Sequence, residues 1–288
     1  MNLSTIRVVW LVPGDAARRF FTVNGLFLAS GLAFSLLLYS VPLVLLVVAA
    51  LGHTLVGSER ALTEVQSILR QILPDAEQTA LRGLATAVAN QRALGLSGVV
   101  LLALFSSTTF GSARFGLNVM FGVERRRGFL RGMALDAVMI LVLSALFGVT
   151  IVLNSALGAI RAAGDTAPFV GPFLRSNWFM ASEVLGTAFV LALCYLVYRV
   201  CPAHTLARSS LVVAALTSTG LLELFRWAFG WYASAMRDMT VIYGAIGSVV
   251  LFILWLYYSA LVFFFGAAVG WAVDRHLRVQ TSSEAKFR

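Results

Sequence analysis

Five ionisable side chains stand inside otherwise apolar stretches of this 288-residue sequence, where they could carry chemistry. They are Arg114, Asp136, Glu183, Glu223 and Arg226. A charge inside a hydrocarbon layer is costly, so such a residue usually faces a partner charge, a wet cavity or a substrate path. We therefore treat all five as candidates for a path along which a headgroup, an ion or a proton is held.

Glu223 and Arg226 lie three positions apart, near the middle of one apolar stretch. In a helix this spacing places both side chains on one face, where they can neutralise each other, and Trp227 and Trp231 continue that face. One interpretation is a polar site near the middle of the membrane. The other is an internal salt bridge that only allows the helix to insert. Glu183 lies near the external end of the preceding stretch, where an interfacial position is the simpler interpretation.

Arg114 and Asp136 each lie eleven positions from residue 125, at the centre of a basic turn. In an antiparallel hairpin the two side chains would therefore reach the same depth. A buried ion pair is one interpretation. In the other, Arg114 extends to the headgroups while Asp136 sits near water in the first turn of its helix.

The basic turn itself lies in the stretch "NVMFGVERRRGFLR" and contains Arg125, Arg126, Arg127 and Arg131. Positive charge next to apolar spans is typical of the cytoplasmic side and is attracted by anionic headgroups. Nucleic-acid binding would need aromatic residues or a groove among the basic residues, and the turn has only Phe121 and Phe129 at its rims. We expect a headgroup-facing turn and no nucleic-acid partner.

Motifs of common enzymes are absent from the sequence. It has no phosphate-binding loop, no dinucleotide fingerprint, no HExxH and no GxSxG. The carboxylates are scattered singly, and the three histidines lie in separate segments without metal-ligand spacing. Cys194 and Cys201, seven positions apart on one expected helix, are too distant for a disulfide. We expect no enzyme activity, no cofactor and no metal.

The elements that position these residues follow from composition. The chain is 59% hydrophobic and only 12% charged, with a mean hydropathy of +0.87, which indicates a membrane protein. A span needs about 20 apolar residues in a helix. Six segments reach that length, and together they predict an all-α, polytopic, single-domain bundle over 1–288: 26–51, 94–121, 133–158, 178–198, 210–235 and 243–272.

Six spans place both termini on one side of the membrane. The segments on that side, 1–25, 122–131, 199–209 and 273–288, hold 13 basic residues, and the opposite connections hold 7. The positive-inside bias therefore predicts that both termini are cytoplasmic. No secretory signal is expected, because the apolar run before Pro13 is too short.

The segments outside the spans predict three further features. The external stretch 52–93 has apolar residues at helical spacing and a break at Pro74, which indicates an amphipathic helical pair, either a plain lid or a device that captures substrate. Residues 14–24 predict a short interfacial helix. The polar tail "QTSSEAKFR" predicts disorder.

Small residues and one proline indicate how the spans pack. Gly266 and Gly270 form a GxxxG pattern in the last span, which allows another helix to approach closely. Pro42 should kink the first span because it removes a backbone donor.

Several of these stretches resemble one family of bacterial proteins. The hairpin "LNVMFGVERRRGFLRG" and the last span "YGAIGSVVLFILWLYYSALVFFFGAAV" are similar to the YihY/BrkB family of inner-membrane proteins, as are "LLELFRWAFGWY" and "AFSLLLYSVPLVLL". The resemblance covers about 15–275. Eight positions match the family pattern: Asn118, Glu124, Arg126, Glu223, Tyr243, Gly244, Trp255 and Gly266.

The resemblance implies a six-helix protein of the bacterial inner membrane without an established biochemical activity. Relatives carry labels as a ribonuclease and as a serum-resistance factor, and some are linked to export of envelope lipids or lipopolysaccharide. The residues give the ribonuclease label no support.

Two functions remain as alternatives. The first is transport or transbilayer handling of an envelope lipid or other amphiphile, with Glu223 and Arg226 as its polar contact and membrane lipids as its partners. The second is a scaffold that binds envelope-assembly proteins through the external helical pair and the GxxxG face. The sequence does not predict the oligomeric state.

Overall fold

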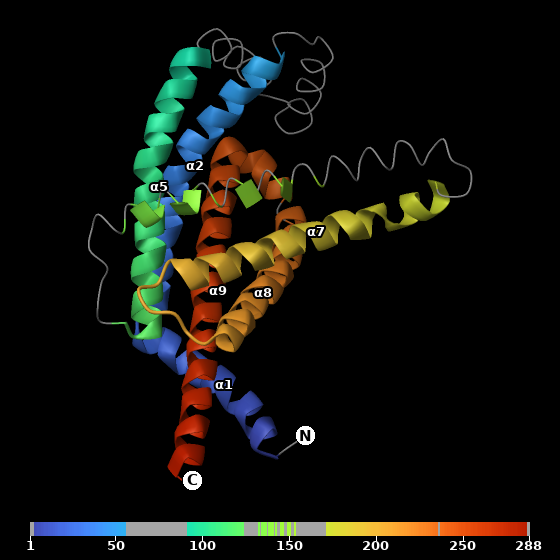
Figure 1. The fold of residues 1–288 in the computed structure, drawn as a ribbon. Coiled ribbons are helices and arrows are strands. Elements are labelled where there is room, and N and C mark those ends of the chain that lie inside the picture. Colours follow the sequence, from blue (N-terminus) through green and yellow to red (C-terminus); the bar gives the residue numbers. More distant parts are fainter. Residues whose placement is uncertain are drawn as a thin grey trace. The chain divides into compact units, whose positions relative to one another are not determined.

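Long helices make up most of the described part of the chain (Figure 1). The structure, a computed structural model, describes residues 3–55, 91–123, 171–235 and 237–286, with individual residues between 132 and 153. The elements in chain order are α1 (Leu3–Thr22), α2 (Gly25–Leu55), α5 (Gln91–Phe121), α7 (Gly171–Val200), α8 (Arg208–Ala235) and α9 (Arg237–Lys286). These ranges contain no strand, as expected for an all-α protein.

Five of the helices contain a stretch that is long and apolar enough to cross a membrane. These are Gly25–Leu43, Val100–Phe121, Glu183–Val200, Arg208–Tyr232 and Val249–Val279. They coincide with the first, second, fourth, fifth and sixth predicted spans, which confirms a polytopic helical membrane protein. The third span, 133–158, falls largely outside the described residues, so a total of six stays a prediction.

Two other predicted features also lie outside the described residues. One is most of the external helical pair within 52–93. The other is the basic turn with Arg125, Arg126, Arg127 and Arg131.

The chain divides into two compact units. The larger consists of Met1–Phe34 and Phe110–Arg288, and the smaller is Ser35–Thr109. In the smaller unit, Thr109 Oγ1 donates a hydrogen bond to the carbonyl of Ser35 (3.0 Å), which joins α5 to α2. Pro42 lies inside α2 and is buried. The kink expected at Pro42 stays a prediction, as does the single domain.

Within the larger unit, α8 and α9 pack closely because small residues line their contact. A Cβ added at Gly266 would overlap Ser218 Oγ, and one added at Gly270 would lie 2.7 Å from Ala214 Cβ. Side chains at these positions would therefore push the two helices apart. Gly266 and Gly270, which the sequence marks as packing positions, thus lie in the contact of α9 with α8.

Helix α1 lies against the C-terminal half of α9. Phe20 meets Phe265 edge to face at 6.0 Å between ring centroids, and Asp15 Oδ2 lies 2.9 Å from His276 Nε2. Residues 15 and 276 therefore occupy one end of this unit. This contact is compatible with six membrane crossings, and the number of crossings stays a prediction.

Described residues of three segments predicted to share the cytoplasmic side lie at this end, together with the C-terminus of α5, which leads into the fourth segment. Arg19 of α1 donates to the carbonyls of Val119 (2.7 Å) and Met120 (3.0 Å), at the C-terminus of α5. Asp274 of α9 accepts a hydrogen bond from the Ala207 N–H (2.8 Å), just before α8. The grouping of these connections agrees with the charge count, and which side of the membrane they occupy stays a prediction.

Two predicted terminal elements differ from the structure. The interfacial helix expected at 14–24 belongs to α1, which already begins at Leu3 and continues through Pro13. The tail expected to be disordered continues α9 as far as Lys286. Its polar composition suits an exposed helix extension as well as it suits disorder.

Candidate functional site

A network of four polar side chains joins α7 and α8. Arg226 Nε lies 2.9 Å from Glu223 Oε2, one turn back on α8, and the same guanidinium forms an ion pair with Glu183 on α7. Thr187 Oγ1, one turn after Glu183, donates to the other oxygen of Glu223 at 2.9 Å. The structure thus brings three of the predicted site residues together, with Arg226 between the two carboxylates.

An open groove of about 460 Å³ adjoins this network on α8. It is lined by Glu223, Arg226, Trp227, Gly230 and Trp231. Trp227 is 74% and Trp231 is 71% exposed, and the side chain of Arg226 is 55% exposed. Two large aromatic side chains and an accessible guanidinium therefore lie beside each other on an exposed face of α8.

The charges of the network determine what it can accept. Two carboxylates and one guanidinium carry a formal net charge of minus one. In a medium without water that charge favours a proton or a cationic group, and an exposed guanidinium can also bind a phosphate oxygen. The groove therefore suits a headgroup that carries both an amine and a phosphate.

The network lies within both helices, away from their ends. Arg226 precedes Ala235, the last residue of α8, by nine positions, about 14 Å at ~1.5 Å per residue. Glu183 lies twelve positions after Gly171, the first residue of α7. The ion pair fixes both residues at one depth, and the position of that depth in the membrane stays a prediction.

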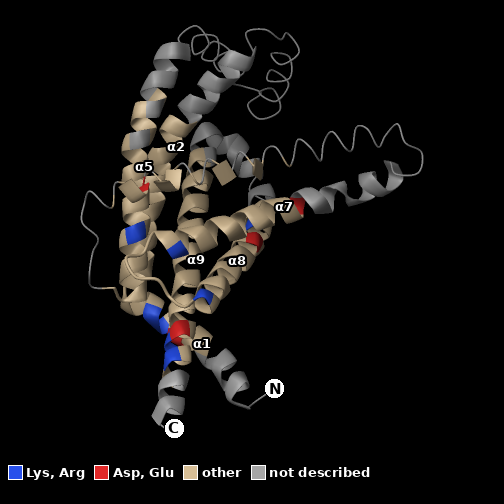
Figure 2. Ribbon diagram, in the orientation of Figure 1, with Lys and Arg blue, Asp and Glu red and all other residues tan. Residues whose placement is uncertain are grey.

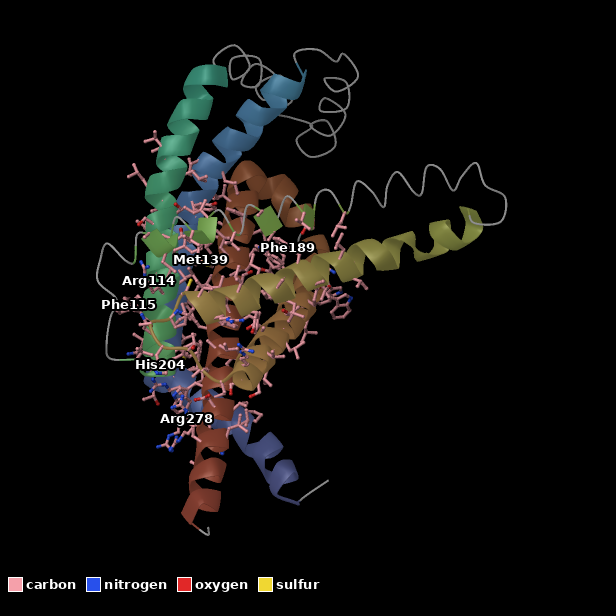
Figure 3. All side chains as sticks on the ribbon, in the orientation of Figure 1. Arg114, Phe115, Met139, Phe189, His204 and Arg278 are labelled. Carbon is pink, nitrogen blue, oxygen red and sulfur yellow. The ribbon has the colours of Figure 1, made fainter. Side chains whose placement is uncertain are left out.

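Arg114, labelled on α5 in Figure 3, forms an ion pair with Asp136, which is one of the two interpretations of these residues. Arg114 Nη1 lies 3.0 Å from Asp136 Oδ1, and Nη2 donates to Oδ2 at 3.2 Å. Nη1 also donates to the carbonyl of Gly132 at 2.8 Å. Asp136 is only 4% exposed, so this two-pronged pair is buried and replaces the alternative of a guanidinium extended to the headgroups.

Charged residues elsewhere gather near the ends of α1 and α9 (Figure 2). Among the described residues no group of three or more His, Cys, Asp or Glu side chains could hold a metal ion. Cys194 and Cys201 are both buried, and neither forms a disulfide within the described part of the chain.

Comparison with known proteins decides the family. The family model described as virulence factor BrkB matches residues 16–288, nearly the whole chain. The chain belongs to the virulence factor BrkB family.

Relatives of this BrkB family chain are named UPF0761 membrane proteins. The one from Chromobacterium violaceum is 27% identical over 253 residues, which cover 87% of this chain and 59% of the relative. The one from Rhodospirillum centenum is 26% identical over 260 residues, covering 90% and 56%. The chain thus spans less than two-thirds of the length of these relatives. No solved structure shows significant similarity to it.

Four of the positions that match the BrkB pattern have contacts in the structure. Asn118 Oδ1 accepts a hydrogen bond from the Ala203 N–H at 2.8 Å, which fixes the connection between α7 and α8. Trp255 stacks on Phe225 at 5.1 Å, and Gly266 packs on α8. Of these four residues, only Glu223 belongs to the candidate site.

Sequence reasoning missed Thr187 and a polar region on α9. Thr187 lies four positions after Glu183, a spacing that would have placed it on the same helix face. Trp271, Asp274, Arg275 and Arg278 follow the helical spacing i, i+3, i+4 and i+7 on α9. That pattern was visible in the sequence, whereas its proximity to Arg19 and to the start of α8 depends on tertiary structure.

Proposed function

We propose that this BrkB family chain aids the transport or transbilayer handling of an envelope lipid or other amphiphile and is not an enzyme. The observation that carries the proposal is the Glu183–Arg226–Glu223 network beside an open, tryptophan-lined groove on α8. In the proposal the chain lies in the bacterial inner membrane with both termini in the cytoplasm, and membrane lipids are its partners.

The groove offers different surfaces to the apolar and the polar part of an amphiphile. Trp227 and Trp231 offer amphipathic rings of the kind that sit at the headgroup level of a bilayer. Glu223 and Glu183 would receive an amine, and the exposed part of Arg226 would receive a phosphate oxygen. A headgroup held in this way exchanges its hydration for protein contacts, which lowers the cost of moving it toward the hydrocarbon core.

The ion pairs of the network can rearrange, because Arg226 can pair with either of two carboxylates. A lipid amine that takes the place of Arg226 at one glutamate leaves the guanidinium paired with the other. Neither charge is then left alone in a medium of low dielectric, where an unpaired charge is costly.

A lipid-scrambling assay tests the proposal. The purified chain is reconstituted into vesicles that contain phosphatidylethanolamine with a fluorophore on one acyl chain, so that the amine stays free. A membrane-impermeant reductant then bleaches the outer leaflet, and further loss of signal reports lipid that has crossed. We expect crossing that exceeds protein-free vesicles and that falls in Glu223→Gln. Crossing equal to that of empty vesicles would remove the proposal.

The scaffold alternative has less support than the groove. The GxxxG face that it assigned to envelope-assembly partners is covered by α8, because Gly266 and Gly270 lie against Ser218 and Ala214. Its other element, the external helical pair, falls outside the described residues.

A further inference from the structure

A second cavity lies at the end of the larger unit where the predicted cytoplasmic segments meet. It has a volume of about 660 Å³ and is lined from the C-terminus of α5, the connection before α8, and α9. Its lining residues are Phe121, Gly122, Val123, His204, Leu206, Trp271, Asp274, Arg275 and Arg278. This volume is within the ~300–1,000 Å³ of ordinary ligand pockets.

The walls of this cavity are built from ordered backbone. Gly122 has φ +70°, its N–H donates to the carbonyl of Val119 (3.2 Å), and the Val123 N–H donates to that of Asn118 (2.8 Å). These two bonds form a Schellman motif, which ends α5 sharply at the cavity. On the opposite wall, Asp274 accepts from the Ala207 N–H at 2.8 Å and holds the start of α8.

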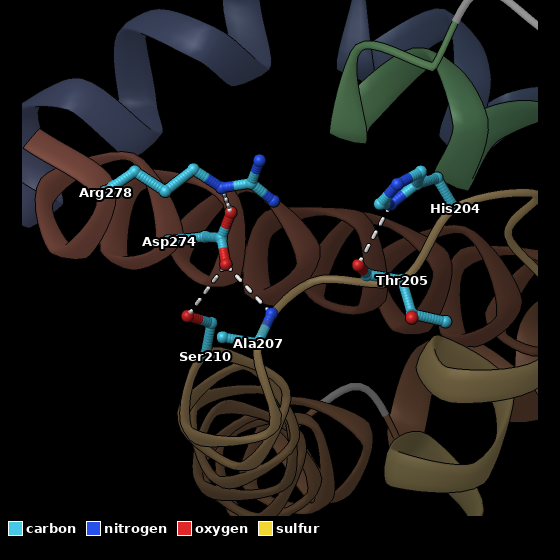
Figure 4. Close-up of polar contacts among 6 residues, drawn as sticks. All are labelled: His204, Thr205, Ala207, Ser210, Asp274 and Arg278. Carbon is cyan, nitrogen blue, oxygen red and sulfur yellow. Dashed lines mark hydrogen bonds and ion pairs between the residues drawn. The ribbon is translucent and has the colours of Figure 1, made fainter. Parts of the chain in front are cut away.

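The charge of the lining is positive. The lining contains two arginines, Arg275 and Arg278, and one carboxylate, Asp274. Asp274 Oδ1 accepts from the Ala207 N–H, and Oδ2 accepts from Arg278 at 2.6 Å (Figure 4). His204 also lines the cavity, and its Nδ1 lies 3.1 Å from the Thr205 carbonyl oxygen. Asp274 therefore neutralises only one of the two arginines.

A third arginine, Arg19 of α1, lies next to the Trp271 side chain of the cavity lining. The guanidinium of Arg19 lies 4.8 Å and that of Arg275 lies 5.5 Å from the centre of the Trp271 ring. Burial lowers the pKa of Arg19 from its ordinary value, but an arginine remains charged at neutral pH. Its position is fixed by hydrogen bonds to the carbonyls of Val119 and Met120, where it stabilises the negative end of the α5 dipole.

We propose that this cavity binds a phosphate group, with Arg275 and Arg278 as its contacts, and that the phosphate belongs to the headgroup of an anionic lipid. Arginine forks match phosphate oxygens in geometry. The apolar lining by Phe121, Val123 and Leu206 suits the glycerol and upper acyl region of a lipid. Trp271 suits the level of the headgroups. This site is independent of the groove on α8, since binding here requires no transport.

Native mass spectrometry of the purified full chain tests this site. The detergent-solubilised protein is titrated with phosphatidylglycerol, with phosphatidylcholine, and, in a separate arm, with inorganic phosphate. We expect tighter binding of phosphatidylglycerol than of phosphatidylcholine. Arg275→Gln should weaken it about fivefold and R275Q/R278Q about twentyfold. The matched control is Arg199→Gln, an exposed arginine at the end of α7 outside the cavity lining, which should bind as the wild type does.

The arms distinguish the sources of phosphate and protect the test against misfolding. Binding of phosphatidylglycerol that depends on Arg275 supports the lipid headgroup. Arginine-dependent binding of inorganic phosphate without a preference for phosphatidylglycerol supports phosphate recognition and overturns the lipid assignment. Arg275→Gln leaves the hydrogen bonds of Asp274 in place, so it tests the site even where the double variant fails to fold. Unchanged binding of both probes by Arg275→Gln would overturn the proposal.

Discussion

Arg226 on α8 forms an ion pair with Glu183 on α7, a residue 43 positions earlier in the chain. The pair joins two apolar helices and gives Glu183 of α7 a partner, whereas Arg226 also pairs with Glu223 of its own helix. Because Glu223 and Thr187 complete the network, the charges of both helices are satisfied by each other. The adjacent groove remains open to a ligand.

The buried pair of Arg114 and Asp136 should contribute strongly to stability. Replacing Asp136 by Ala leaves the guanidinium without its partner, and removing one member of a buried pair typically costs about 3–5 kcal/mol. We expect a loss of several degrees in the melting temperature, measured by fluorescence-detected size exclusion after heating. The exchange R114D/D136R should recover part of this loss, since the charges pair again while the bond to the Gly132 carbonyl is absent. An exchange variant that is no more stable than Asp136→Ala would contradict the pairing.

The close approach of α8 and α9 should make Gly266 intolerant of even a methyl group. Gly266→Ala places a Cβ onto Ser218 Oγ, and overpacking of this kind costs about 1–3 kcal/mol. Gly220→Ala is the matched control, because a Cβ there meets nothing within 4 Å. We therefore expect a clearly lower melting temperature for Gly266→Ala than for Gly220→Ala. Equal melting temperatures would show that the helices do not meet as described.

Asp274, a residue of α9, should stabilise the start of the neighbouring helix α8. Its Oδ1 accepts from the Ala207 N–H, and its negative charge lies at the positive end of the helix dipole. We expect Asp274→Ala to lower the free energy of unfolding by about 1–2 kcal/mol and Asp274→Asn, which keeps an acceptor oxygen, to lower it less. Denaturant titrations of the two variants measure the difference. An equal loss in both would remove the hydrogen bond from the explanation.

The orientation of the chain can be read by cysteine labelling. Cys194 and Cys201 are buried, so a new cysteine at the exposed position of His204 can be labelled selectively. We expect His204→Cys to react with an impermeant maleimide only after the inner membrane is permeabilised. Thr240→Cys, in the connection predicted to be external, should react in spheroplasts without permeabilisation. The reverse pattern would contradict cytoplasmic termini.

Patterns along the helices predicted much of this architecture. The five described spans and the positions of the packing glycines follow from hydropathy and spacing, each of which acts over a few turns of one helix. The side of the membrane assigned from the charge count stays a prediction. Glu223 and Arg226 were predicted to pair because their contact is also local.

Contacts between helices account for what the sequence did not predict. That Glu183 joins Arg226, and not the headgroups, depends on how α7 crosses α8, which no local spacing determines. The cavity around Trp271 has the same origin, since the C-terminus of α5, the connection before α8, and α9 each contribute a few residues to its lining. The C-terminal extension of α9 was missed because polar composition suits both an exposed helix and a disordered tail.

The central claim is that the groove on α8 moves or holds a lipid headgroup through its charges. The most direct measurement is the initial rate of phosphatidylethanolamine crossing in reconstituted vesicles, compared among wild type, Glu223→Gln and Thr217→Val. Thr217 lies on α8 outside the groove lining and donates only to the carbonyl of Val213 in its own helix. We predict crossing by wild type and Thr217→Val at similar rates and a rate about tenfold lower for Glu223→Gln, the effect of about 1.4 kcal/mol. Equal rates for all three proteins, or a wild-type rate no higher than that of protein-free vesicles, would contradict the claim.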